Sequence, residues 1–388
     1  MIKLLTVIGA RPQIIKSAAI SRAIKEHFSD SIVEKILHTG QHYDANMSQV
    51  FFDELGIPQP DFNLGVGSGS HGEQTAKMIS GIEQVLTAEH FDGVILYGDT
   101  NSTLAGAVAA AKIHIPVFHV EAGLRSYNMA MPEEQNRIVC DQLSSILFAP
   151  TQTAVDNLAR EGFNVSEATF ANGKKRKVAK SGDVMYDNSM FFGKMLSASV
   201  DGVSKEEKIL AGYGVEAGGF ALATIHRDNN TDQPERLSSI FKALLDISEK
   251  AHLDIVLPLH PRTKKLLENN LDEDLYHRVL SSARLKLVPP ASFFEIIALE
   301  KNAQIVLTDS GGVQKESFFF ERPCVILRPE TEWVEIVEHG AGILADADYD
   351  RIISAFDSLV GNEVHFPPLF GDAKASEKIL CEILKYLN

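Results

Sequence analysis

Short apolar runs alternate with amphipathic stretches along most of the chain. In the first half, the apolar runs predict strands at Leu4–Ile8, Val33–His38, Val94–Gly98, Val117–Glu121 and Ile146–Ala149. Between them, Thr75–Leu86 and Asn101–Ile113 have the spacing of amphipathic helices. Strands that alternate with helices in this way are typical of parallel α/β sheets.

The pattern is interrupted near the middle of the chain. Over Phe163–Gly182 it weakens, and Asn172–Lys177 predicts a turn or hairpin with a solvated basic tip, which we favour over a nuclear-localisation signal. Alternation then resumes with strands predicted at Phe220–Ile225, Ile255–Leu259, Leu285–Val288, Ile305–Thr308 and Cys324–Leu327. We therefore expect an α/β protein of two doubly wound domains, residues 1–176 and 177–368, with ligands bound in the cleft that the domains face.

Composition and charge narrow the class of protein. Hydrophobic residues make up 45% of the 388 residues and charged residues 23%, which excludes disordered, collagen-like and disulfide-rich chains. The 37 Lys and Arg against 52 Asp and Glu give a net charge of −15, which argues against nucleic acid or an anionic membrane as a partner. An anionic substrate would therefore need a local basic pocket.

The 3 cysteines build neither a disulfide framework nor a zinc ribbon, and they favour a reducing cytoplasm. No apolar run approaches the roughly 20 residues that cross a bilayer.

Polar and glycine-rich segments follow several of the predicted strands, where an open α/β sheet binds its ligands. The first, Gly9–Lys16, places Pro12 in the first turn of a helix, and it places Arg11 and Lys16 near the positive end of that helix, where an anion fits. It is not a Walker loop, because Gly-x-x-x-x-Gly-Lys is missing. A plain strand-to-helix turn with solvated charges explains this segment equally well.

Carboxylates follow the next strands. Asp99 comes directly after one strand and before an Ala-rich helix, Glu121 ends the next strand, and Glu133 begins a helix shortly after. Asp99 is either an N-cap or a catalytic carboxylate, and for a single Asp before a helix the N-cap is the commoner role. Because the carboxyl ends of parallel strands lie at the same edge of the sheet, we expect the three side chains to lie at that edge. Crowded carboxylates have raised and separated pKa values, which suit general acid/base catalysis.

The second half carries a comparable set of polar residues. His226 and Arg227 end a buried strand, and His260-Pro261-Arg262 follows the next one. Further on, a strand leads through Ser310-Gly311-Gly312 into a helix, and bare glycines let phosphate oxygens approach the backbone N–H groups at a helix N-terminus. This segment is either a diphosphate site or a capped turn with glycines for close packing, and both interpretations stay open.

Two further patterns are weaker. Gly67–Gly72 matches Gly-x-Gly-x-x-Gly, but it follows a poor strand and has no acidic residue at the usual distance, so we expect a loop and not a dinucleotide site. His38 and His42 have i, i+4 spacing, but no Glu lies between them and the segment runs off a strand, which argues against a zinc helix. We expect no metal and no cofactor.

These segments together resemble one enzyme family over almost the full length of the chain. The matching motifs, in order, are Gly9-Ala10-Arg11-Pro12, Gly98-Asp99-Thr100, His119-Val120-Glu121-Ala122-Gly123-Leu124-Arg125, Pro132-Glu133-Glu134-x-Asn136-Arg137, His226-Arg227 and Asp309-Ser310-Gly311-Gly312-x-Gln314-x-Glu316. On these motifs the chain resembles the non-hydrolysing UDP-N-acetylglucosamine 2-epimerases. The resemblance implies two Rossmann-like domains of the glycosyltransferase B type, with a C-terminal helix at 369–388 that returns to the first domain. It also implies a UDP-sugar substrate, held mainly by the second domain, and a homodimer.

The resemblance implies a reaction and a set of residue roles as well. Family members invert C2 of the hexosamine without NAD, by eliminating UDP to leave a 2-acetamidoglucal and adding UDP back after protonation on the opposite face. By resemblance Asp99, Glu121 and Glu133 are acid/base or supporting carboxylates, and His226 assists the departing diphosphate. The residues assigned to substrate binding are Arg11, Lys16 and Arg137, which add positive charge, Ser310, Gly311 and Gly312, which hold phosphate oxygens, and Glu316, which accepts hydrogen bonds from the ribose.

The chain departs from the commoner pattern of this family at two places. Tyr43 stands where many members have Arg, which weakens the transfer of an allosteric UDP-sugar site, and Trp333 stands where many have Arg on the uridine or phosphate side. The variants around Lys315 and Trp333 resemble the subgroup that acts on UDP-2,3-diacetamido-2,3-dideoxyglucuronate. We expect UDP-N-acetylglucosamine as the substrate, with the uronate as an alternative. A UDP-sugar glycosyltransferase is the alternative from another class.

Overall fold

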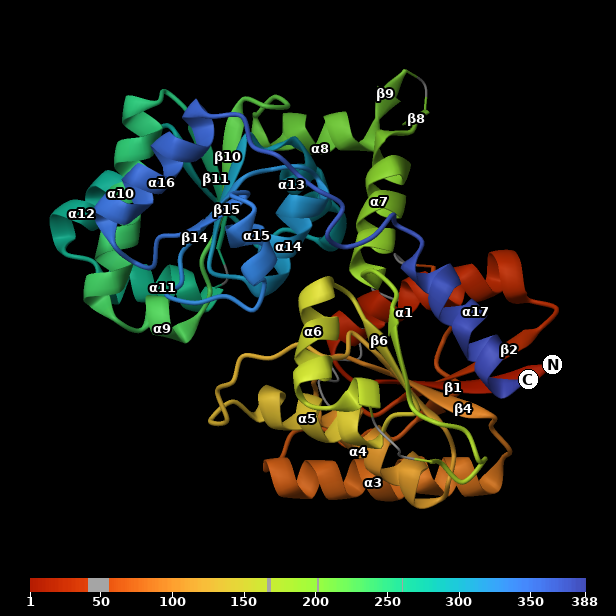
Figure 1. The fold of residues 1–388 in the computed structure, drawn as a ribbon. Helices are drawn as coiled ribbons and strands as arrows, with labels where there is room; N and C mark the ends of the chain where they lie inside the picture. The colour runs from red at the N-terminus through yellow and green to blue at the C-terminus, as the bar shows by residue number, and fades with distance from the viewer. Residues whose placement is uncertain (41–55, 166–168, 201, 260) are drawn as a thin grey trace. The chain divides into compact units, whose positions relative to one another are not determined.

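Two units, each built on its own parallel sheet, make up the chain (Figure 1). The computed structural model describes residues 1–40, 56–165, 169–200, 202–259 and 261–388. The first unit comprises Met1–Asn188 and Pro368–Asn388, and the second comprises Ser189–Pro367. The expectation of two Rossmann-like domains is confirmed, and the return of the C-terminus to the first unit agrees with the resemblance.

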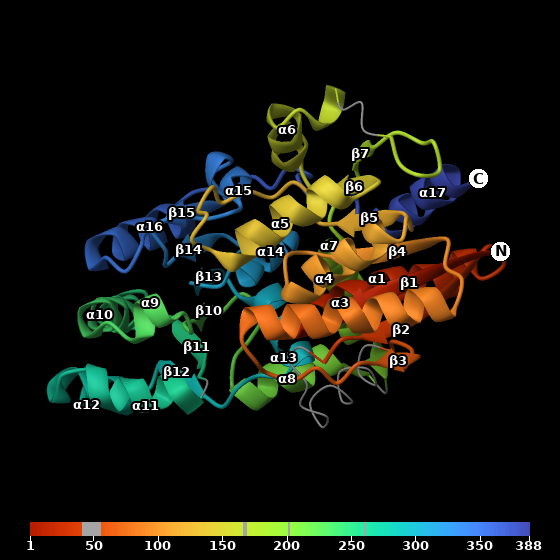
Figure 2. The ribbon, with the colours of Figure 1, turned by 90° about the horizontal axis from the view of Figure 1, so that it is seen from below.

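The first sheet has 7 strands in the order β3-β2-β1-β4-β5-β6-β7, which Figure 2 shows side by side. All neighbouring pairs are parallel. The strands are β1 Ile2–Ile8, β2 Ile32–His38, β3 Phe62–Asn63, β4 Gly93–Tyr97, β5 Val117–Val120, β6 Ile146–Ala149 and β7 Lys177–Lys180. The central strand β4 is buried along its whole length, because helices cover both faces of the sheet.

Helices α3, α4 and α5 cover one face of this sheet, and α1 and α17 cover the other (Figure 1). The helices of the first unit are α1 Arg11–Ala23 with its π-helical extension η1 Ile24–Phe28, α3 His71–Ala88, α4 Asn101–Lys112, α5 Pro132–Leu143, α6 Gln152–Arg160, the short η2 Phe163–Val165 and α17 Ala375–Leu387. Helix α7, Val184–Ser197, begins in the first unit and ends in the second. The Ala-rich sequence of α4 lets it lie close to β4, since an added Cβ at Gly106 would come within 2.5 Å of Leu96.

The second sheet has 6 strands in the order β12-β11-β10-β13-β14-β15, again all parallel (Figure 2). The strands are β10 Phe220–Thr224, β11 Asp254–Pro258, β12 Leu285–Val288, β13 Ile305–Thr308, β14 Cys324–Ile326 and β15 Gly342–Leu344. A separate antiparallel pair, β8 Ser199–Val200 and β9 Val203–Ser204, precedes them. The strand order is that of a Rossmann fold.

Two hydrophobic layers cover this second sheet. Side chains of α10, α11, α12 and α16 pack on one face, and side chains of α8 and α13 pack on the other. The helices are α8 Lys205–Tyr213, α9 Asp228–Thr231, α10 Pro234–Lys250, α11 Pro261–Asn270, α12 Glu273–Ser281, α13 Phe293–Asn302, α14 Gly311–Phe319, α15 Val334–Glu338 and α16 Tyr349–Gly361.

The first unit extends beyond the boundary expected at Arg176. The turn at Asn172–Lys177 is present, with an isolated antiparallel bridge between Thr169 and Lys175, but its tip is not simply solvated. Lys174 donates to the carbonyl oxygen of Tyr386 in α17, and Arg176 Nε donates to the carbonyl oxygen of Ser144 at 3.1 Å. The chain then adds β7 to the edge of the first sheet. Basic side chains therefore attach this segment to the first unit and do not mark the domain boundary.

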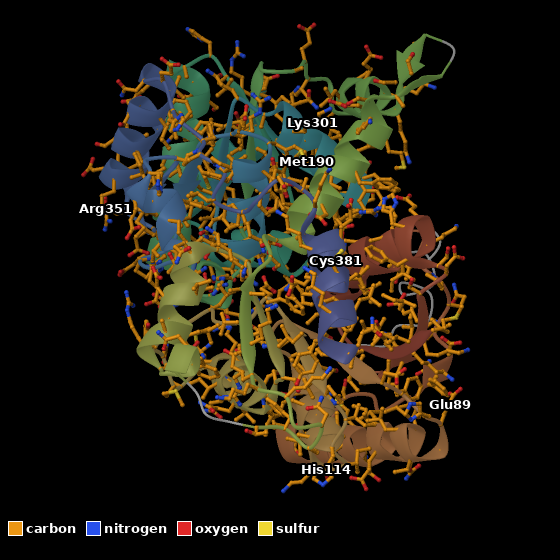
Figure 3. The ribbon with its side chains drawn as sticks, turned by 45° about the vertical axis from the view of Figure 1, so that its right-hand side comes forward. Glu89, His114, Met190, Lys301, Arg351 and Cys381 are labelled. Carbon is orange, nitrogen blue, oxygen red and sulfur yellow. The ribbon has the colours of Figure 1, made fainter. Side chains whose placement is uncertain are left out.

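None of the helices in the described ranges is long and apolar enough to cross a membrane. The cysteines are unpaired thiols: Cys140 and Cys324 are buried, and Cys381 is exposed on α17, where Figure 3 labels it.

Candidate active site

In both sheets several of the candidate segments follow the two strands beside the point where the strand order reverses. In the first sheet this point lies between β1 and β4, which lead into Gly9 and Gly98. In the second sheet it lies between β10 and β13, which lead toward His226 and Asp309. Helices leave the two strands toward opposite faces at such a point, so the carboxyl ends of the strands border a crevice where ligands bind.

Hydrogen bonds of the Gln13 side chain connect the ends of β1 and β4 in the first unit. Its buried carboxamide oxygen accepts hydrogen bonds from the N–H groups of Gly9, at 2.9 Å, and Ala10, at 3.2 Å. Its amide nitrogen donates to the carbonyl oxygen of Tyr97 at 3.0 Å and to Thr103 Oγ1 at 2.9 Å. Sequence reasoning missed this residue. Gln13 satisfies the N–H groups of Gly9 and of the N-cap residue Ala10, and it thereby fixes the position of the turn that leads into α1.

Asp99 is not the N-cap of α4. That role belongs to Thr100, whose hydroxyl accepts from the N–H of Thr103 at 3.3 Å. Asp99 instead receives Arg137, whose Nε and Nη2 donate to the same carboxylate oxygen at 3.0 and 2.6 Å. Asn136 donates to the carbonyl oxygen of Asp99 at 2.8 Å. The interpretation of Asp99 as a simple helix cap is therefore wrong, and a cation from α5 orients its partly exposed carboxylate.

Glu121 lies directly after β5 and forms an ion pair with Lys16 of α1. Its backbone is left-handed, with φ at 69°, a conformation that is strained for a residue with a side chain and is concentrated at functional sites. Gly98 lies beside the pair, and a Cβ added to Gly98 would be 3.2 Å from Lys16 Nζ and 3.3 Å from Glu121 Oε2. The structure thus brings two predicted site residues, Lys16 and Glu121, into contact.

The two neighbouring glutamates at the start of α5 lie in different environments. Glu133 is exposed and makes no hydrogen bond or ion pair with the described residues, whereas Glu134 is buried. Glu134 accepts from Arg137 Nη1 at 2.6 Å, from the N–H and hydroxyl of Ser126, each at 3.0 Å, and from the N–H of Tyr127 at 2.9 Å. Burial opposes the charge of Glu134, but these donors outweigh burial and lower its pKa. Glu134 therefore holds Arg137 and the 126–127 loop in place, a role that sequence reasoning missed.

In the second unit Asp309 organises the end of β10. The buried carboxylate accepts from the N–H groups of His226, at 3.1 Å, and Arg227, at 3.0 Å, and from the amide of Asn230 at 3.1 Å. His226 Nδ1 lies 3.0 Å from Asp309 Oδ1, while 55% of the His226 side chain is exposed. Burial opposes the charge, but His226 and these donors outweigh it and lower the pKa of Asp309. The contact orients His226 Nε2 away from Asp309, where it is available to a ligand.

Ser310, Gly311 and Gly312 form the start of α14. Ser310 is the N-cap, with its hydroxyl 3.4 Å from the N–H of Val313. A Cβ added to Gly311 would meet its first neighbour, Glu332 Oε2, at 3.5 Å, and one added to Gly312 would meet Ser310 Oγ at 3.8 Å, both ordinary contacts. Neither glycine has a positive φ. The protein's own packing therefore does not require glycine at either position, which favours close approach of a ligand to this helix N-terminus.

Glu316, one turn further along α14, has a buried acidic neighbour. Glu300 of α13 has no exposed surface, and neither of its carboxyl oxygens has a hydrogen-bond partner among the described residues. Burial, and then the adjacent carboxylate of Glu316, raise the pKa of Glu300 well above its ordinary value of 4.5. Glu300 is therefore a neutral carboxylic acid beside the half-exposed Glu316.

Glu300→Gln is expected to remove a pH dependence of stability. In the folded protein Glu300 holds its proton above pH 4.5, whereas in the unfolded chain it releases that proton, so the unfolded state gains stability as pH rises. Relative to Glu300→Gln, the wild-type free energy of unfolding should fall with rising pH, by up to about 1.4 kcal/mol per pH unit. Urea unfolding of both proteins at successive pH values measures the difference, and parallel curves would contradict it.

Trp333 packs against a buried lysine of α14. Lys315 Nζ lies 4.3 Å from the centre of the Trp333 ring, and both side chains are buried. Beside them, Arg328 donates to Glu332 from Nη1 at 2.8 Å and from Nη2 at 3.2 Å. Where many family members have Arg, this chain thus has an aromatic ring and a cation nearby, within reach of the Gly311 end of α14.

Several expectations concern other residues. Arg11 is exposed in the first turn of α1. Residues 67–70 form the expected loop, with Ser70 as the N-cap of α3, whereas His71 and Gly72 already belong to the first turn of that helix. Burial lowers the pKa of His38 to about 4, and His38 Nδ1 accepts from the N–H of Gly40 at 3.0 Å. Within the described ranges, no group of His, Cys, Asp and Glu has the arrangement of a metal site. The patterns at His42, Tyr43 and His260 lie outside the described residues.

The sequence model of one protein family, described as UDP-N-acetylglucosamine 2-epimerase, matches residues 23–385. The chain belongs to this epimerase family. Among curated relatives, a Pseudomonas aeruginosa protein named UDP-2,3-diacetamido-2,3-dideoxy-D-glucuronate 2-epimerase is 45% identical over 97% of this chain and 98% of its own. A Methanocaldococcus jannaschii protein named UDP-N-acetylglucosamine 2-epimerase is 40% identical over 99% of both chains.

Solved structures of the epimerase family share the fold. The M. jannaschii enzyme in complex with UDP-GlcNAc and UDP matches with a TM-score of 0.81 at 40% identity, over 99% of this chain and 100% of that one. The Neisseria meningitidis UDP-GlcNAc 2-epimerase bound to UDP-GlcNAc matches with a TM-score of 0.83 at 28% identity, with the same coverage.

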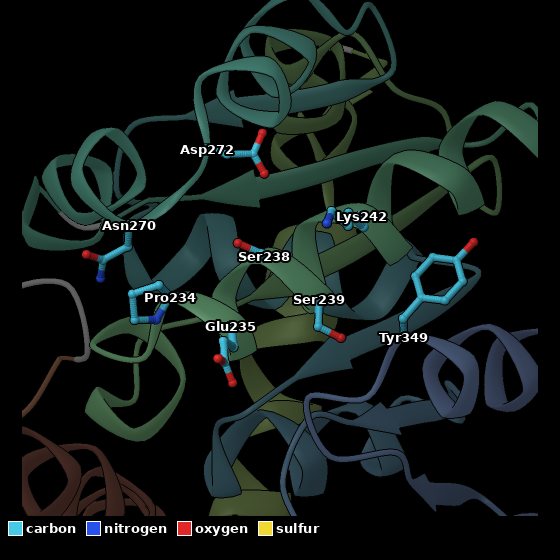
Figure 4. A pocket seen from close by; sticks show the side chains of 8 residues that line it. All are labelled: Pro234, Glu235, Ser238, Ser239, Lys242, Asn270, Asp272 and Tyr349. Atoms are coloured by element: carbon cyan, nitrogen blue, oxygen red, sulfur yellow. The ribbon is translucent and has the colours of Figure 1, made fainter.

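One open pocket of about 600 Å³ lies on the helical face of the second unit (Figure 4). It is lined by Pro234, Glu235, Ser238, Ser239, Lys242, Asn270, Asp272 and Tyr349. None of the motif residues of the epimerase family lines it, and its residues belong to or adjoin α10, α11, α12 and α16, the helices that cover one face of the sheet. We therefore do not assign the reaction to this pocket.

Proposed function

We propose that this chain is a nucleotide-sugar C2 epimerase that interconverts UDP-N-acetylglucosamine and UDP-N-acetylmannosamine. The observation that carries the proposal is the pair of oriented carboxylates, Asp99 and Glu121, which follow the neighbouring strands β4 and β5 of the first sheet. Each is joined to a cation, Arg137 or Lys16. Oriented acid/base groups near C2 are what inversion at that carbon requires.

The proposed reaction proceeds by elimination and re-addition. A carboxylate removes the proton from C2, the electrons of that C–H bond form the C1=C2 double bond, and the bond from C1 to the diphosphate oxygen breaks with its electrons leaving on UDP. The 2-acetamidoglucal is then protonated at C2 on the opposite face, and the UDP oxygen bonds to C1 again. We assign the acid/base and supporting roles to Asp99, Glu121 and Glu133.

The departing diphosphate carries the charge that develops in the transition state, so its binding site contributes to the rate. We propose that Ser310, Gly311 and Gly312 hold phosphate oxygens at the N-terminus of α14, where N–H groups and the helix dipole favour an anion. His226, oriented by Asp309, donates to the leaving oxygen. Glu316 accepts from the ribose hydroxyls, and Arg11, Lys16 and Arg137 add positive charge.

Incubation with UDP-N-acetylglucosamine in deuterated water is expected to yield UDP-N-acetylmannosamine with deuterium at C2. The elimination releases the C2 proton to the enzyme and the solvent, and the return step takes a solvent-derived deuteron. Proton NMR follows the loss of the C2 signal. Epimerisation with the original C2 proton retained would exclude the elimination. Release of free N-acetylmannosamine would show a hydrolysing enzyme, and turnover only with an added acceptor would show a glycosyltransferase.

A second substrate is favoured by the 45% identity to the diacetamido-glucuronate 2-epimerase and by Trp333. Its C6 carboxylate needs a cation in hydrogen-bonding range. Arg125 is already held, because it donates to Glu161 from Nε at 2.6 Å and from Nη2 at 2.8 Å and pairs with Asp141 at 2.8 Å. Arg262 is paired in the same way, because it contacts Asp228 and donates from Nη2 to both oxygens of Asp232 at 2.8 Å. The arginines that remain as candidates are Arg11 and Arg227.

We expect kcat/KM for UDP-N-acetylglucosamine to be at least equal to that for the uronate when the two are measured side by side. The family motifs are present in the chain, whereas the cation for a C6 carboxylate is not assigned. A preference for the uronate above roughly tenfold, about 1.4 kcal/mol of transition-state binding, would reassign the substrate and leave the reaction type intact.

We also propose that the enzyme acts as a homodimer in the cytoplasm. The dimer follows the resemblance to the family, and the cytoplasmic location rests on the unpaired cysteines. Sedimentation velocity of the purified chain tests the dimer, and a monomer at working concentration would overturn it.

A further inference from the structure

A fully buried ion pair lies between the two turns that carry Asp99 and Glu121. His119 of β5 and Asp141 of α5 have no exposed side-chain surface, and His119 Nδ1 lies 2.7 Å from Asp141 Oδ1. On its other side, His119 Nε2 lies 2.8 Å from the carbonyl oxygen of Gly98, the residue before Asp99. None of the roles proposed above uses this histidine.

The partners of His119 determine its protonation. A carbonyl oxygen only accepts, so Nε2 carries a hydrogen, and Asp141 is a carboxylate because Arg125 Nη2 pairs with its other oxygen at 2.8 Å, so Nδ1 donates to it. His119 is therefore an imidazolium with both nitrogens donating. In agreement, although burial opposes the charge, Cys140 and Asp141 outweigh burial and raise the pKa of His119 well above its ordinary value.

The same pair reaches the turn that follows Glu121. Asp141 Oδ2 accepts from the N–H of Gly123 at 3.2 Å. Gly98, Glu121 and Gly123 all have left-handed backbones, with φ at 60°, 69° and 81°, and such conformations persist only where neighbouring contacts hold them. His119 and Asp141 together supply buried, charge-assisted contacts to both turns.

We propose that His119 is a positioning residue. One of its hydrogen bonds holds the turn at Gly98, and the other, through Asp141, holds the turn at Gly123, so that the carboxylates of Asp99 and Glu121 are placed correctly relative to C2 of the sugar. This inference rests on the proposed epimerase function. Displacing a reacting group by about 1 Å can cost roughly 10²-fold in rate without a change in substrate binding, so the expected effect is on kcat.

Two substitutions separate the contacts of His119. In His119→Asn the amide nitrogen takes the place of Nδ1 and keeps the bond to Asp141, but it loses the carbonyl of Gly98. In His119→Gln the amide nitrogen takes the place of Nε2 and keeps the bond to Gly98. We expect kcat to fall roughly 10- to 100-fold in His119→Asn and less in His119→Gln, with KM within about threefold of wild type in both.

Glu161→Gln is the matched control. Glu161 lies at the outer end of the same network, where it binds Arg125 but neither turn, so the variant should lower the melting temperature and leave kcat unchanged. A wild type that is inactive on both UDP-sugars would overturn the proposed function and this inference with it. Two outcomes with an active wild type would overturn this inference alone. One is a kcat within about twofold of the wild-type value in both His119 variants, and the other is a loss of kcat in Glu161→Gln equal to that in the His119 variants.

The protonation of His119 gives a test that does not depend on turnover. In 15N NMR of the histidine-labelled wild type at neutral pH, both ring nitrogens of His119, assigned by their absence in His119→Asn, should be protonated. An unprotonated ring nitrogen would contradict the double donation on which the positioning depends.

Discussion

Asp99→Asn and Glu121→Gln are each expected to lower kcat by roughly 10² or more while UDP binds almost as well as in the wild type. An amide keeps the size of the side chain and can still contact Arg137 or Lys16, but it cannot exchange a proton with C2. Single-turnover rates and calorimetric titration with UDP measure the two effects. Normal turnover in both variants would show that these carboxylates only organise the turns in which they lie.

Glu133 needs its own comparison, because it is exposed in the first turn of α5 and makes no polar contact with the described residues. We expect Glu133→Gln to lower kcat to a similar degree, since we assign it an acid/base or supporting role. Glu235→Gln is the matched control: Glu235 also follows a proline that begins a helix, α10, and is also exposed. Equal activity in Glu133→Gln and Glu235→Gln would reduce Glu133 to a favourable charge at a helix N-terminus.

Gly311→Val is expected to weaken UDP binding by roughly 10- to 100-fold, the value of one or two charge-assisted hydrogen bonds to phosphate. The valine side chain would fill the space through which a phosphate oxygen reaches the N–H groups at the start of α14. Gly311→Ala should have a smaller effect of the same kind, because its Cβ meets no protein atom closer than 3.5 Å. Calorimetric titration with UDP measures both.

Gly212→Ala serves as the control for the glycine series. Gly212 is exposed in α8 of the same unit, and a Cβ there would meet nothing within 4 Å. UDP affinity and melting temperature should both be preserved or improved, since alanine favours the helix. Unchanged UDP affinity in a folded Gly311→Val protein would show that phosphate does not approach this glycine.

The fold was predictable where strands are buried on both faces and was not at the sheet edges. The sequence of β4 is Gly-Val-Ile-Leu-Tyr, an uninterrupted apolar run that is typical of a central strand. β7 reads as Lys-Val-Ala-Lys, with exposed lysines, and it pairs on one side only. Edge strands carry charge for reasons of solubility, so their sequences resemble loops. For this reason the sequence did not predict a strand at Lys177–Lys180, and the boundary expected at Arg176 assigned these residues to the second domain.

The candidate site was predictable to the level of segments but not of individual contacts. Helical spacing distinguishes Glu134 from Glu133, because Glu134, Arg137 and Asp141 recur at three and four residues and so share the buried face of α5. That signal was available in the sequence. The hydrogen bonds of Gln13 and His119 could not be predicted from the sequence, because they join residues of different strands and helices that only the folded sheet brings together.

The return of the C-terminus to the first unit has a consequence for biosynthesis. The first turn of α17 is capped by Asp187, whose carboxylate accepts from the N–H groups of Ala375, at 2.9 Å, and Ser376, at 2.8 Å. Residues Ser189–Pro367 are contiguous and can fold as they leave the ribosome, whereas Met1–Asn188 are completed only by a helix that is translated after the whole second unit. A stop codon before Ala375 would thus leave the second unit complete and expose the face of α1 that α17 covers, which makes the first unit the target of quality control in nascent chains.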